Sequence, residues 1–75
     1  MIELGLTRAE LEAAWAYALG AEMPRVSGYL MGALETAPEV NGLLRFWLVD
    51  AYAVDVLAVI SELAAKREAL TPIWS

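Results

Sequence analysis

The sequence contains no cysteine and no histidine. Without cysteine the chain can form neither a disulfide nor a thiolate site, and without histidine it lacks the commonest metal ligand and general base. The other residues show no phosphate-binding loop, metal-ligating cluster or nucleophile–base pair. We therefore expect a protein that is not an enzyme and that uses no cofactor and no metal. The lack of disulfide chemistry favours a cytoplasmic location.

Basic residues are scarce as well, because five Lys and Arg residues stand against ten Asp and Glu residues. The resulting net charge of -5 repels nucleic acids and anionic membrane surfaces at long range. This charge favours a basic partner, or no partner.

Apolar residues, by contrast, make up 60% of the sequence, and they concentrate in residues 43–70, LLRFWLVDAYAVDVLAVISELAAKREAL. At 100° per residue this segment shows an apolar stripe with three- and four-residue spacing, which is typical of a helix. We interpret the stripe as an oligomer interface. Asp50, a polar residue among apolar ones, is then the residue that fixes its register. The predicted interface residues are Phe46, Val49, Ala53, Val56, Ile60 and Leu63.

The length of this helix also indicates self-association. A straight helix over residues 39–70 would be about 48 Å long, whereas a compact chain of this size is about 30 Å across. Either the helix breaks near Asn41-Gly42, or a second copy covers part of its surface. We expect a homodimer or higher oligomer built on a long dimerisation helix over residues 38–70.

A membrane span is the alternative interpretation of residues 43–60. It would place Arg45, Asp50 and Asp55 inside the bilayer, where each charge costs about 2.5–3.5 kcal/mol near a helix centre. These costs largely cancel the gain from the apolar residues, so we expect no membrane association. The first residues also lack the basic leader and short apolar core of a signal peptide.

The first half of the chain carries clear helix signals. Thr7 and Glu10 have the spacing of a capping box, which predicts a helix over residues 8–19. Pro24 suits the first turn of a second, short helix over residues 21–32, which Gly32 should end before a linker at residues 33–37. The predicted inner face of the first helix consists of Leu11, Ala14, Trp15 and Ala18.

The junction between these two helices reads Leu19-Gly20, three further residues, Pro24-Arg25-Val26-Ser27, then Leu30 and Gly32. This pattern resembles the turn and recognition helix of Cro and lambda-repressor type helix-turn-helix DNA-binding proteins, over about residues 7–32. The resemblance implies that Gly20 permits a tight turn, that Ala16 lies at the helix crossing, and that Val26 and Leu30 anchor the second helix. The residues that it implies would face DNA are Met23, Pro24, Arg25, Ser27 and Gly28.

Two functions are compatible with this half of the chain. In the family that it resembles, a Gln often stands at the position of Met23 and a longer polar residue at that of Gly28, and only Arg8 and Arg25 lie nearby to contact phosphates. The first hypothesis is a homodimeric regulatory protein, a transcription regulator that binds DNA. The alternative is an acidic module, an inhibitor or adaptor, that uses the same scaffold to bind another protein.

Together these patterns predict an all-α protein with a single helical domain over residues 1–75. Short helices form a helix-turn-helix-like first half, and the long apolar helix follows. Trp47 and Trp74 are the candidate exposed aromatic residues for partner contacts.

Overall fold

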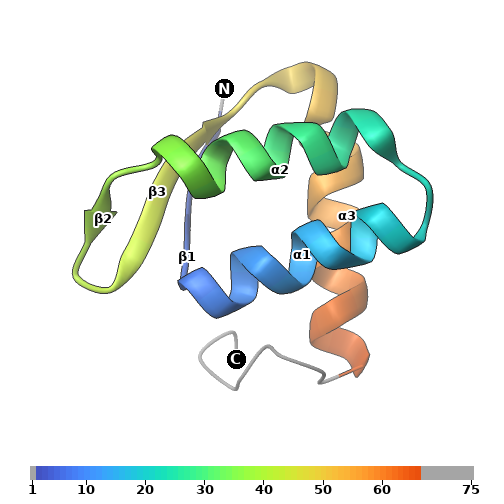
Figure 1. The fold of residues 1–75 in the computed structure, drawn as a ribbon, viewed down its shortest axis with the longest axis horizontal. Coiled ribbons are helices and arrows are strands. Elements are labelled where there is room, and N and C mark those ends of the chain that lie inside the picture. Colours follow the sequence, from blue (N-terminus) through green and yellow to red (C-terminus); the bar gives the residue numbers. More distant parts are fainter. Residues whose placement is uncertain (1, 67–75) are drawn as a thin grey trace.

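A computed structural model describes residues 2–66 and shows a mixed α/β fold rather than the all-α fold predicted from the sequence (Figure 1). Three helices pack against a three-stranded antiparallel sheet whose strand order is β1-β3-β2. The strands are β1 (Ile2–Leu6), β2 (Glu39–Val40) and β3 (Leu43–Leu48), and the helices are α1 (Arg8–Gly20), α2 (Pro24–Thr36) and α3 (Asp50–Lys66).

The largest correction concerns residues 43–48, which form β3 and not the first turns of a long helix. Burial along this strand alternates, so that Leu44, Phe46 and Leu48 are buried while Arg45 and Trp47 are exposed. This alternation has the period of two that a half-buried strand requires. The sequence does not show this alternation clearly, because the outward-facing Trp47 is itself a large apolar residue.

A tight turn at Asn41-Gly42 joins β2 to β3. Both residues have positive φ angles, 55° at Asn41 and 82° at Gly42. Positive φ at both central residues defines the type I′ turn, for which Asn-Gly is a favoured sequence. The predicted helix break near this dipeptide is therefore a hairpin turn, and the chain enters it from a strand.

Helix α3 has 17 residues and is therefore about 25 Å long, which fits within the 28 Å longest dimension of the molecule. The expectation of a dimer rested on a helix that is too long for one chain, and no such helix forms. The stripe predicted as the oligomer interface instead faces the chain's own core. Phe46, Val56, Ile60 and Leu63 are buried there, while Val49 and Ala53 are half-buried. Asp50 is the exposed first residue of α3.

Helix α1 begins as the sequence predicts. The backbone N–H of Glu10 donates to Thr7 Oγ1 at 3.1 Å, and the backbone N–H of Thr7 donates to Glu10 Oε1 at 2.9 Å. This reciprocal pair is the predicted capping box. Helix α2 extends beyond its predicted end, because Gly32 does not stop it and residues 33–36 continue the helix.

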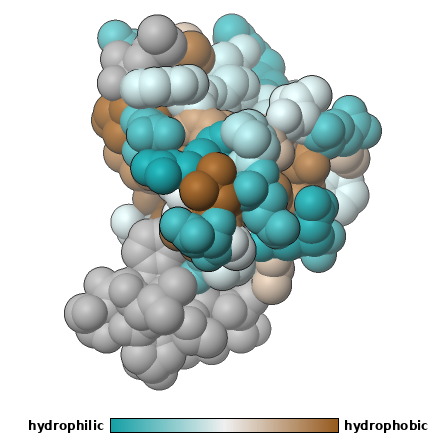
Figure 2. Space-filling view, turned by 90° about the vertical axis from the view of Figure 1, so that its left-hand side faces the viewer, coloured by the Kyte–Doolittle hydropathy of each residue, from teal (hydrophilic) through white to brown (hydrophobic). Residues whose placement is uncertain are grey.

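The core lies between the inner face of the sheet and the three helices. Helices α1 and α2 lie side by side, α3 crosses them near one end, and the hairpin projects at the other (Figure 1). The end of the molecule that carries the hairpin is mostly hydrophilic, with hydrophobic groups interspersed (Figure 2). The large side chains that are essentially fully buried are Leu6, Leu11, Leu30, Leu44, Leu48 and Val56.

Within residues 2–66, no helix combines the length and the apolar composition needed to cross a bilayer.

Candidate functional site

The turn between α1 and α2 is closed by main-chain hydrogen bonds. The N–H of Met23 donates to the carbonyl of Ala18 at 2.9 Å, and Glu22 takes the left-handed conformation with a φ of 58°. The resemblance placed these roles two residues earlier, at Ala16 and Gly20. In the structure the buried small residue four positions before the left-handed residue is Ala18, whereas Ala16 is exposed.

Of the five residues predicted to face DNA or a partner, the structure groups three. Met23 is half-buried, and Pro24 and Arg25 are exposed beside it at the start of α2. Ser27 is buried, and its hydroxyl donates to the carbonyl of Pro24 at 3.1 Å. Gly28 is exposed on a different side of α2. A single partner surface around the turn therefore includes the first three residues and excludes the last.

Three shallow hollows meet at Met23. The first lies between α1 and α3 and has a volume of about 140 Å³; its other lining residues are Tyr17, Asp55, Ala58, Val59 and Glu62. The second, of about 250 Å³, lies over the turn and is lined also by Leu19, Glu22, Pro24 and Ser27. The third, of about 270 Å³, is lined also by Pro24, Arg25, Val26 and Asp55. We call the exposed and half-buried residues among these the Met23 surface.

Three carboxylates border the Met23 surface. Glu22, Asp55 and Glu62 are all exposed, and within the described part of the chain none of them forms an ion pair or a hydrogen bond through its side chain. The two nearby cations are engaged with aromatic rings of the same chain. The guanidinium of Arg25 lies 5.7 Å from the ring centroid of Tyr52, and Lys66 Nζ lies 5.4 Å from that of Tyr17.

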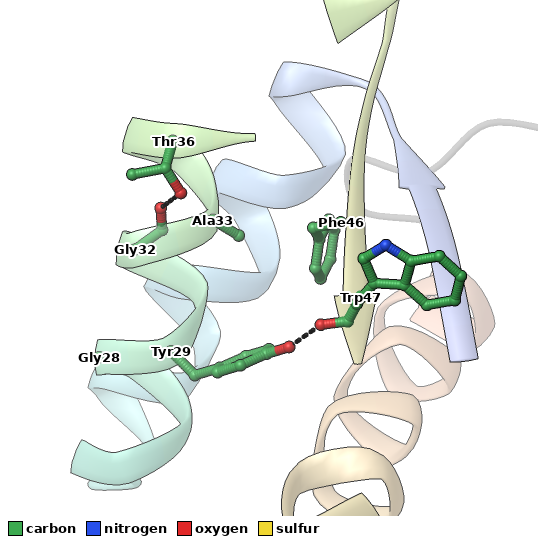
Figure 3. A pocket seen from close by; sticks show the side chains of 7 residues that line it. All are labelled: Gly28, Tyr29, Gly32, Ala33, Thr36, Phe46 and Trp47. Carbon is green, nitrogen blue, oxygen red and sulfur yellow. Dashed lines mark hydrogen bonds between the residues drawn. The ribbon is translucent and has the colours of Figure 1, made fainter. Parts of the chain in front are cut away.

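A separate groove lies between α2 and β3, and it has a volume of about 420 Å³ (Figure 3). The hydroxyl of Tyr29 reaches across it and donates to the main-chain carbonyl of Trp47. The indole of Trp47, whose residue is 58% exposed, lies on the side of β3 away from α2 (Figure 3). Trp47 therefore lines this groove without turning its indole toward α2, and it is not part of the Met23 surface. Trp74 lies outside the described residues.

The aromatic side chains beside this groove form a stacked group. The ring of Tyr29 stacks on that of Tyr52, with centroids 4.8 Å apart, and meets the ring of Phe46 edge-on at 6.4 Å. Through Tyr52 this group also reaches Arg25. The guanidinium that the resemblance would place against DNA is thus held against the face of α3.

The sequence did not indicate that α3 contributes to the same surface as the turn. Asp55 and Glu62 are seven residues apart, which places them on one side of a helix, and Ala58 lies between them. That spacing was visible, but which side of α3 meets α1 depends on tertiary packing. In residues 2–66 no group of His, Cys, Asp or Glu side chains is arranged to hold a metal ion.

Comparison with protein-family models, with curated proteins and with solved structures finds no match for this chain.

Proposed function

We propose that this chain is a regulatory protein-interaction module, which uses a helix-turn-helix-like scaffold to bind another protein and not DNA. One observation carries the proposal. The Met23 surface consists of apolar hollows bordered by Glu22, Asp55 and Glu62, whereas a DNA-binding surface at this place requires cations.

The electrostatic argument follows from how proteins bind DNA. Affinity for DNA comes largely from Lys and Arg side chains that contact phosphates. Around the turn, Arg25 is stacked on Tyr52, and three exposed carboxylates border the same surface. A phosphate backbone placed here would meet more negative than positive charge, so the scaffold repels the ligand that the resemblance implies.

Two positions along α2 lack the side chains needed to read bases. Gly28 and Gly32 line the groove beside β3, and no atom lies within 4 Å of where a Cβ would stand on either residue. Base recognition in the major groove depends on long polar side chains such as Arg, Asn and Gln. At these two positions α2 presents only its main chain to a ligand.

The apolar part of the surface suits a protein partner. Methionine is flexible and polarizable, and it adapts to partner side chains of different shapes. Leu19, which is half exposed, and Met23 both line one hollow. Shallow hollows with an apolar centre and a polar border match the general anatomy of protein–protein interfaces.

The test compares three forms of the full chain: the wild type, Met23→Asp, and Trp47→Ala as a control at an exposed apolar residue away from the surface. Each is immobilised and exposed both to an extract of the cells that encode it and to a random duplex DNA library at low salt. We expect the same proteins on wild type and Trp47→Ala, their loss on Met23→Asp, and no enriched duplex. Enrichment of a duplex on the wild type and Trp47→Ala that is lost on Met23→Asp would overturn the proposal and establish DNA binding.

A further inference from the structure

Helix α3 has two sides of opposite character. Val56, Val59, Ile60 and Leu63 are buried in the core. The opposite side carries exposed residues at alternating spacings of three and four, namely Ala51, Val54, Ala58, Ser61 and Ala65. This is the spacing with which one helix packs along another. Val54 is 79% exposed, more than any other large hydrophobic residue in the described chain.

This outward seam of α3 is continuous with the Met23 surface. Ala58 belongs to the seam and also lines the hollow that Tyr17 and Met23 form with α3. The seam has small side chains along most of its length, which lets a second backbone approach closely. The hollow beside it can accept a larger side chain from whatever lies along the seam.

The charges along the seam indicate which kind of helix fits. Asp55 and Glu62 follow the same edge of the seam, and Asp50 lies on the other edge. In a parallel pair of α3 helices Asp50 would oppose Asp55 of the second copy, and in an antiparallel pair Asp55 would oppose Glu62. Both orientations bring like charges together, so a second copy of this chain is a poor occupant.

We infer that the occupant is an amphipathic α-helix of a partner protein, with a continuous apolar face and Lys or Arg residues along its edges. It packs along the seam of α3 and places one apolar side chain beside Met23, while its basic residues face Asp55 and Glu62. This inference rests on the proposed function and specifies the partner. The chain's net charge of -5 also speeds the approach of a basic helix and disfavours acidic competitors.

The experiment uses three synthetic peptides of 21 residues with one apolar face in common. Their edge positions are all Lys, all Gln or all Glu. Binding to the full chain is followed by fluorescence anisotropy, and peptide helicity by circular dichroism. We expect the Lys peptide to bind at least tenfold more tightly than the Gln peptide at low salt, to gain helicity on binding, and to lose most of that advantage at high salt.

A charge reversal tests the location. The double variant Asp55→Lys/Glu62→Lys should prefer the Glu peptide. The control Glu35→Lys/Glu39→Lys makes the same change in net charge at exposed residues of α2 and β2, and it should keep the preference for Lys. All variants are first checked for wild-type circular dichroism, and the four substituted residues are exposed, so each should fold.

Four results would overturn the inference. The first three are equal binding of the Lys and Gln peptides, binding without a gain in helicity, and a control variant that changes preference as the test variant does. Failure of all three peptides to bind would also overturn it. In that case the proposed function still stands if Met23→Asp loses the captured proteins, because the partner then binds in another conformation. Enrichment of a duplex DNA would instead remove the proposed function itself.

Discussion

Replacing Gly42 by alanine tests whether residues 41–42 form a hairpin turn or part of a helix. The two structures predict changes of opposite sign in the free energy of unfolding. In the hairpin, Gly42 has a φ of 82°, and no atom lies within 4 Å of an added Cβ. The substitution therefore adds no steric contact, and its whole effect comes from the backbone conformation. In a helix, the same change would stabilise the chain by about 0.8–1 kcal/mol.

The magnitude follows from two opposing terms. Holding a residue with a Cβ in the left-handed region costs about 1–2 kcal/mol. Alanine also restricts the unfolded chain, which returns about 0.4–1 kcal/mol. The difference between these terms is a loss of up to about 1.6 kcal/mol in the free energy of unfolding, with a middle value of about 0.8 kcal/mol. In a chain of this length 1 kcal/mol corresponds to a shift in Tm of about 4–8 °C.

The assay is urea unfolding followed by circular dichroism, with Gly28→Ala as the matched control. Gly28 lies inside α2, and its added Cβ also meets open space. Its replacement should stabilise the chain by about 0.5–1 kcal/mol. Stabilisation by Gly42→Ala of the same size as by Gly28→Ala would refute the hairpin and restore a helical segment there.

Three further predictions test the packing and the capping. Thr7→Ala removes the side chain that caps α1 and should lower the free energy of unfolding by about 1 kcal/mol, whereas Glu12→Ala, on the exposed side of α1, should change it little. Leu30→Ala empties a fully buried site and should cost about 2–5 kcal/mol in a urea titration, enough to unfold most of so small a domain. Arg45 and Glu3 approach to 3.3 Å at the surface, and a double-mutant cycle should give a coupling below about 1 kcal/mol that falls with salt.

Helix α1 could be predicted from the sequence because its start signal is local. The side chains of Thr7 and Glu10 each accept a hydrogen bond from the other residue's main-chain N–H. These bonds lie within four residues, so the start of the helix does not depend on distant parts of the chain. The end of α2 could not, because Gly32 stops a helix only where nothing else holds the next turn. Leu30 and Ala33 are buried against the other elements, and this packing stabilises the helical conformation on both sides of Gly32.

The segment over residues 43–48 was predicted as helix because a short segment in which five of six residues are apolar fits a buried strand as well as a buried helix. The decisive local signal was Asn41-Gly42, whose turn chemistry indicates a hairpin before any periodicity is considered. Only Val49 separates the end of β3 from the start of α3. The apolar residues of the strand and of the helix therefore look like one continuous helical stripe in the sequence.

The candidate site was predicted in part. Met23, Pro24 and Arg25 lie together because they follow one turn in the sequence. Asp55 and Glu62 join them only through the packing of α3 on α1, which no local pattern encodes.

The shortness of β2 bears on how this chain avoids aggregation. Pro38 precedes it, accepts a hydrogen bond from the N–H of Arg45 at 3.0 Å, and has no N–H to return. The ladder beside β3 therefore ends after two residues of β2. An unpaired strand edge is a template for amyloid-like growth, and natural proteins blunt such edges with prolines and very short strands. The chain is 60% hydrophobic. Pro38 thus limits the length of strand edge with which a second chain could form main-chain hydrogen bonds on this side of the sheet.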